Sequence, residues 1–173
     1  MPATHEPIAS FTVSGSSTNP VTFNNIPQTF TDLMLVIYGR STGTVQLDTT
    51  LAYVNFNTGT NNYSNTNFYT DGSSIVANRA TNQVYFGFGA HPAGGATANV
   101  FGTEVFHILN YTNSTAFKTV LSQASSDLNG SGQMYMGVHL WRQTAAITRL
   151  DMYTSNPAWA AGSKLTLYGI KAA

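Results

Sequence analysis

Short runs in which apolar and polar residues alternate recur from one end of this chain to the other, separated by turns rich in Asn, Gly, Ser and Pro. The segments 8–13, 51–56 and 100–109 show the pattern well. A period of two is the signature of β-strands with one buried face. No strand–helix–strand alternation accompanies it, which argues against a parallel α/β fold. The pattern predicts an all-β chain, a jelly-roll-like antiparallel β-sandwich of about ten strands.

The expected strands follow from these runs and from the turn signals between them. They are 8–13, 21–23, 32–38, 51–56, 68–70, 83–88, 100–109, 116–124, 133–141, 147–153 and 164–171. The segment 32–38 is apolar on both faces, so we expect a central strand covered on each side. The segment 116–124 also fits helical spacing, but its β-rich surroundings favour a strand. Segments 57–67 and 155–162 are expected to be loops.

The length of 173 residues fits one domain, and no linker-like tract divides the chain. We expect a single β-sandwich domain over residues 11–173. Residues 1–10 are irregular in character and are expected to form an N-terminal arm that reaches a neighbouring subunit.

Charged residues make up only 8% of the chain, and seven basic side chains balance seven acidic ones. An average soluble domain carries about 25%. A neutral, charge-poor surface offers no electrostatic attraction for nucleic acid or for an anionic membrane. It also lacks the usual protection against self-association. We therefore expect part of the surface to be buried against neighbouring subunits, with no nucleic-acid or membrane partner.

The ionisable residues form no recognisable catalytic or metal-binding pattern, and there is no cysteine. Glu104 and His107 are three residues apart, which on a strand places them on opposite faces. The segment 127–132 resembles the start of a calcium loop but lacks the acidic residue that closes one, and its residues are typical of turns. There is no nucleophile elbow and no phosphate-binding glycine loop. We expect no metal, no cofactor and no enzymatic activity.

Aromatic residues in polar stretches are the remaining candidates for a binding site. Tyr63, Tyr69, Trp141 and Trp159 lie in or beside such stretches, as do Tyr53 and Phe68. Aromatic rings flanked by Asn and Asp can stack on sugars. Aromatic residues are also common in sandwich cores and in subunit interfaces. Both interpretations stay open at this point.

Three stretches carry a family resemblance. They are Ile-Pro-Gln-Thr-Phe-Thr-Asp-Leu-Met-Leu-Val at 26–36, Trp-Arg-Gln-Thr-Ala-Ala-Ile-Thr-Arg-Leu at 141–150, and Gly-Ser-Lys-Leu-Thr-Leu-Tyr-Gly-Ile-Lys-Ala-Ala at 162–173. In this order they resemble a family of small virion proteins of tailed bacteriophages, common among phages of cyanobacteria and other aquatic hosts. The similarity runs from about Phe11 to the C-terminus, and 57–98 is its least typical part.

The resemblance implies a jelly-roll-like sandwich in a phage particle, with no catalytic residues to transfer. Some relatives are cement proteins that sit as trimers on the outside of the capsid, and others are modules of tail or fibre proteins. The chain is therefore expected to be a capsid decoration (cement) protein. As such it would be made in the cytoplasm of the bacterial host and would bind the major capsid protein as a homotrimer on the virion exterior. The alternative is a tail- or fibre-associated, lectin-like module that recognises host surface glycans.

Overall fold

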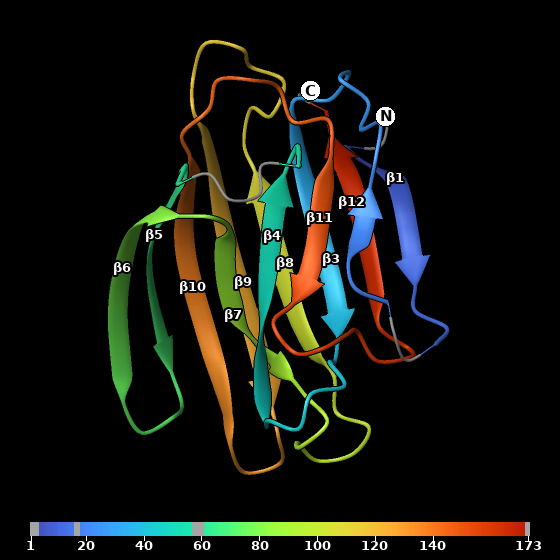
Figure 1. The fold of residues 1–173 in the computed structure, drawn as a ribbon, viewed down its shortest axis with the longest axis vertical. Helices are drawn as coiled ribbons and strands as arrows, with labels where there is room; N and C mark the ends of the chain where they lie inside the picture. Colours follow the sequence, from blue (N-terminus) through green and yellow to red (C-terminus); the bar gives the residue numbers. More distant parts are fainter. Residues whose placement is uncertain (1–3, 16–17, 57–60, 172–173) are drawn as a thin grey trace.

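A computed structural model describes residues 4–15, 18–56 and 61–171. Within these ranges the chain forms strands and no helices, and so contains no helix that could cross a membrane. Two antiparallel sheets of unequal size pack face to face (Figure 1). The predicted all-β sandwich is confirmed. That one sheet has twice as many strands as the other was not predicted.

The large sheet has eight strands. In spatial order they are β1 (His5–Thr12), β12 (Lys164–Ile170), β3 (Asp32–Gly39), β8 (Gly102–Ile108), β9 (Lys118–Asp127), β10 (Gly132–Trp141), β5 (Tyr63–Thr70) and β6 (Ile75–Gln83). The small sheet has four: β2 (Val21–Phe23), β11 (Leu150–Thr154), β4 (Leu47–Val54) and β7 (Phe86–Pro92). Every pair of neighbours is antiparallel.

The hydrophobic core lies between the small sheet and the middle of the large one. Alternate residues of β3, β8 and β12 point inward and are almost completely buried, among them Leu35, Phe106 and Leu167. The strand-like alternation of 100–109 is therefore confirmed, with Phe106 and Ile108 inside and His107 on the opposite face. The ambiguous segment 116–124 is a strand, as its surroundings suggested.

The β5–β6 hairpin extends the large sheet past the edge of the small one, and Figure 1 shows it in green beyond β7 and β4. This region departs most from the sequence expectations. Residues 63–67, expected in a loop, belong to β5. Strand β6 was not predicted, and the strand expected at 83–88 is instead the end of β6 and the start of β7. Residues 57–60 lie outside the described ranges.

The expected N-terminal arm is also corrected. Residues 5–10 belong to β1, which pairs with β12 along its length through partners such as His5 with Ile170 and Ser10 with Thr166. These residues therefore form an edge strand of the sandwich and not a free arm. Residues 1–3 lie outside the described ranges.

Candidate interaction surface

The outer face of the large sheet carries apolar side chains where a solvated sheet normally carries polar ones. Met134 is 65% exposed, Leu121 48% and Met136 46%. Antiparallel sheets with one face in water usually alternate between apolar inside and polar outside. Exposed apolar groups that gather on one face, unlike singly scattered ones, mark interaction sites.

The strand register shows that these side chains form continuous rows across the sheet. One row crosses all eight strands and runs Ser10, Thr166, Val36, Val105, Gln123, Met136, Phe68 and Ala77. A second runs Tyr168, Met34, His107, Leu121, Val138, Thr66 and Arg79. A third runs Lys164, Tyr38, Thr103, Ser125, Met134, Thr70 and Ile75. We call the part of these rows on β3, β8, β9, β10 and β5 the outer face.

Charge is confined to the margins of these rows. Arg79 lies on the edge strand β6, and Lys164 lies on β12 toward the opposite edge. On the outer face itself, the outward positions are uncharged except for Asp32 and Asp127 at the ends of β3 and β9. An apolar centre with polar and charged groups at its rim is the usual anatomy of a protein–protein interface.

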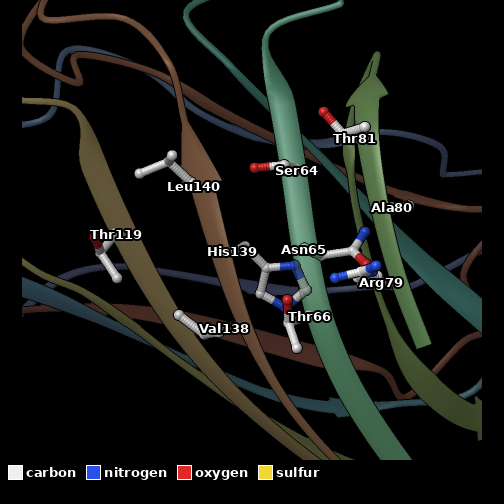
Figure 2. A pocket seen from close by; sticks show the side chains of 10 residues that line it. All are labelled: Ser64, Asn65, Thr66, Arg79, Ala80, Thr81, Thr119, Val138, His139 and Leu140. Carbon is white, nitrogen blue, oxygen red and sulfur yellow. The ribbon is translucent and has the colours of Figure 1, made fainter. Parts of the chain in front are cut away.

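Two shallow hollows lie on this side of the sheet. One of about 450 Å³ lies over β8, β9, β10 and β5 and is lined by Val105, Met134, Met136 and Phe68, together with polar neighbours. The other, also about 450 Å³, lies between β10, β5 and β6, and Figure 2 shows Val138, Thr66 and Arg79 around it. Among the described residues, none gives the Arg79 guanidinium a hydrogen bond or an ion pair. The outer face is therefore hollowed at these two places, and at its rim lies Arg79, a cation that no described residue pairs.

The strand β3 was expected to be covered on both faces, and the structure corrects this. It lies inside the sheet between β12 and β8, but the small sheet covers only its inner side. Met34 and Val36 are partly exposed, and Tyr38 is half exposed. Strand β3 is apolar on both faces, but within a single chain only its inner face is buried.

Three of the four candidate aromatic residues are core residues. Tyr63 and Trp141 are direct cross-strand partners on the inner face of β5 and β10, and both are buried. The Tyr63 ring packs edge-on against Phe86 with centroids 4.8 Å apart, and burial raises its pKa to about 12. Trp159 is fully buried, and its indole Nε1 donates to the Met152 carbonyl at 3.0 Å. Their inward positions exclude them from any glycan site or subunit interface.

Tyr69 is the exception. It is partly exposed on the inward side of the overhanging hairpin, opposite Tyr135 on β10. There it lines a groove that the small sheet does not cover. Tyr69 was a candidate because its neighbours in the sequence are polar. They are polar because both sides of the hairpin are accessible to water.

A buried polar cluster joins the two sheets and was not predicted. His91 Nδ1 of β7 lies 2.9 Å from Glu104 Oε1 of β8, and Thr50 of β4 donates to the same oxygen at 2.8 Å. His91 Nε2 lies 3.9 Å from Asp48 Oδ2. Burial raises the pKa of Asp48, but hydrogen bonds from Ser155 and the Thr49 amide outweigh it and leave the pKa below its usual value. Scattered residues 48, 50, 91 and 104 gave no sequence signal because only the sheet pairing brings them together.

This cluster resembles the arrangement of a catalytic triad, but it is too deeply buried to contact a substrate. The four side chains are between 0% and 3% exposed, and the His91 ring stacks on Trp159 with centroids 5.0 Å apart. Within the described ranges, no group of three or more His, Asp or Glu side chains has a geometry that could hold a metal ion. The cluster ties β4 and β7 to β8 as a structural element.

The two weaker sequence candidates are resolved by local geometry. Glu104 points into the core and His107 to the outer face, so the two do not meet. Asp127 accepts a hydrogen bond from the Asn129 amide at 2.8 Å, and the Leu128 amide donates to the Ser131 carbonyl at 2.7 Å. Residues 127–132 thus form the β9–β10 turn.

Comparison of the chain with protein-family models, with curated proteins and with solved structures finds no match in any of the three. Its function therefore has to come from its residues and their arrangement.

Proposed function

We propose that this chain is a structural protein of a tailed-phage virion that performs no catalysis. In this role it is a capsid decoration (cement) protein that binds the major capsid protein on the outside of the shell, as a homotrimer. The family resemblance of segments 26–36, 141–150 and 162–173 suggests the particle. The outer face of the large sheet carries the proposal, since its exposed apolar side chains and its uncharged centre supply a broad contact surface.

The chemistry of the outer face suits a permanent contact with a protein. Each apolar side chain removed from water there stabilises the complex, at about 25 cal/mol per Å² of buried apolar area. Because the only charged outward positions on the described strands of this face are Asp32 and Asp127 at strand ends, a partner can cover its centre without desolvating an ionic group. A protein that binds only the assembled shell stabilises that state by mass action. Such a role needs extended contact and no reactive group.

The test measures binding of the purified chain to isolated shells that lack it. Leu121→Asp and Met136→Asp each place a carboxylate in the centre of the outer face, and we expect binding at least about tenfold weaker, because burying an unpaired charge is costly. Val45→Asp is the matched control, since Val45 is 42% exposed in the loop before β4 and away from this face. Unchanged binding by both face variants would overturn the assignment of the contact surface.

The location on the particle has a separate test. In purified virions, a cement protein gives a gel band comparable in molar amount to that of the major capsid protein. A band at trace intensity would contradict the capsid location and favour the tail.

A further inference from the structure

A groove of about 570 Å³ lies where the large sheet extends past the small one. Its one wall is the inward side of β5 and β10, and its other wall is the β4–β7 margin of the small sheet. In the covered part of the sandwich the inward side chains of β3 and β12 are apolar, and buried polar ones such as Glu104 are held in contacts within the core. On the hairpin the same side carries Asn65, Asn67 and Asn78. The groove is therefore suited to contact with water or with a polar ligand.

The lining offers hydrogen-bonding groups and aromatic rings but no charge. Side-chain amides come from Asn65, Asn67, Gln83 and Gln133, and rings come from Tyr69, Tyr85 and Tyr135. Among the described residues, no Asp, Glu, Lys or Arg lines the groove. A cleft of a few hundred Å³ with aromatic walls and a few fixed polar groups is the usual form of a small-molecule site.

Several of these groups are free to bind. Asn67 Nδ2 donates to Asn65 Oδ1 at 3.1 Å, and among the described residues none forms a hydrogen bond with the amide oxygen of Asn67 or the amide nitrogen of Asn65. Among the described residues, none forms a side-chain hydrogen bond with Tyr69, Tyr85 or Gln133. A sugar hydroxyl both donates and accepts, so an adjacent amide donor and acceptor match it.

The Tyr85 ring is held in place by two neighbouring tyrosine rings. Tyr85 packs edge-on against Tyr53, with centroids 5.9 Å apart, and Tyr53 packs in the same way against Tyr153 at 5.2 Å. The face of an aromatic ring is electron-rich. The polarised C–H groups on one side of a pyranose ring can therefore stack on it.

The groove disfavours the two other obvious ligand classes. An acidic ligand would have no cation to pair with, because none of the described lining residues is basic. An extended peptide would have to pair with the open edge of β7, but β7 carries Gly87 and Gly89, and its register with β4 shifts between Thr49 and Thr50. Such an irregularity disrupts the ladder that a peptide strand needs.

We infer that this groove binds a neutral oligosaccharide, with Tyr69 and Tyr85 as stacking platforms and Asn65, Asn67 and Gln133 as hydrogen-bonding partners. The site is independent of the outer face and of the chain's place on a particle. On a particle surface, it would give a weak contact with glycans, multiplied by the number of copies present.

The test begins with the wild-type chain on an array of neutral and acidic oligosaccharides and extended peptides, followed by calorimetric titration with the best-bound member. We expect a neutral oligosaccharide to bind, and Tyr69→Ala to weaken binding about tenfold or more. Phe68→Ala is the matched control, because Phe68 is the adjacent residue of β5 and points to the outer face. It should keep full glycan binding.

Gln133→Ala, on β10, provides a second variant if Tyr69→Ala lowers the thermal unfolding midpoint. The inference is overturned if no neutral oligosaccharide binds, if only acidic glycans or peptides bind, or if both folded groove variants bind as wild type does. A defect in shell binding by Leu121→Asp or Met136→Asp leaves the groove untouched, so the two proposals fail separately.

Discussion

Strand β10 presents large apolar side chains on both of its faces, and their surroundings differ completely. Trp141 points inward and is 2% exposed, whereas Met136 points outward and is 46% exposed. Trp141 belongs to the core between the two sheets, but nothing in the described chain covers the outer face of β10. An exposed apolar face of this kind is typical of an interaction surface, and in the proposed role the capsid partner covers it.

The same comparison can be made for the inner side of the large sheet. Under the small sheet it is a close-packed apolar core, and on the β5–β6 hairpin it is a polar groove. The difference follows from the unequal number of strands in the two sheets. Whether the small sheet covers a segment of the large sheet therefore decides whether its inward side chains are mainly apolar or polar.

The largest expected effect comes from breaking the buried cluster on the covered side. His91→Ala removes one of the two side chains that contact Glu104 Oε1 in the core and leaves Thr50 as the other, and we expect the free energy of unfolding to fall by about 3–5 kcal/mol. His107→Ala is the control, because His107 sits on the outer face of β8. Its effect should stay within about 0.5 kcal/mol, as for ordinary surface changes. Urea unfolding measures both, and equal losses would contradict the assignment of the faces.

A matched pair of leucines tests the two faces with the same chemical change. Leu35→Ala removes a side chain that is 1% exposed and should cost about 2–5 kcal/mol. Leu121→Ala removes one that is 48% exposed and should cost less than about 1 kcal/mol in the isolated chain. Chemical denaturation gives both values. In the assembled particle the cost of Leu121→Ala should rise, and no such rise would argue against burial of the outer face.

The inner face should also make stability depend on pH through His139. Burial lowers the pKa of His139 to about 3, whereas a histidine in an unfolded chain titrates near pH 6.5. Below about pH 6.5 the unfolded chain takes up a proton that the folded chain refuses, so the free energy of unfolding falls as the pH falls toward 3. The slope is at most about 1.4 kcal/mol per pH unit.

His139→Gln should remove this contribution, so unfolding curves at about pH 7 and about pH 4.5 should differ less for the variant than for the wild type. Above about pH 7 neither protein should show the effect. An identical acid loss in both proteins would mean that His139 is not the group responsible.

The smallest expected effect on stability is on the outer face. Met136→Lys should change the free energy of unfolding by no more than about 0.5 kcal/mol, because Met136 is exposed in the isolated chain. The same change should lower the fluorescence of a dye that binds exposed apolar surface. Val45→Lys, away from the face, should leave the fluorescence unchanged. A large loss of stability in Met136→Lys would show that the face is packed within the chain.

Strands with a covered face were predictable from the sequence because one-sided burial imposes alternation. This holds for β8 and β12, whereas β3 and β10 were found as apolar runs between turn signals, and the bounds of all four lie within a few residues of those expected. Strand β6, with the sequence Ile-Val-Ala-Asn-Arg-Ala-Thr-Asn-Gln, carries no such signal because neither of its faces is buried. The β5–β6 hairpin therefore could not be predicted from a pattern of apolar and polar residues.

The candidate sites show the same limit. Tyr63, Trp141 and Trp159 were singled out for their polar neighbours along the chain, but the strand pairing turns them into the core. The rows of the outer face and the His91 cluster depend on register between distant strands, which the sequence does not display. What could be foreseen was the surplus of apolar side chains and the shortage of charge.

The β5–β6 turn has a consequence for how such a chain can be extended. Asp71 accepts hydrogen bonds from the Ser73 and Ser74 amides, both at 2.9 Å, so the turn closes upon itself. Residues 71–74 are all exposed and lie at the tip of the hairpin, at the opposite end of β5 from the buried Tyr63. Doubling the length of a flexible loop costs only about 0.6 kcal/mol. A foreign peptide inserted here should leave both sheets intact, so this turn is a suitable site for a peptide insertion.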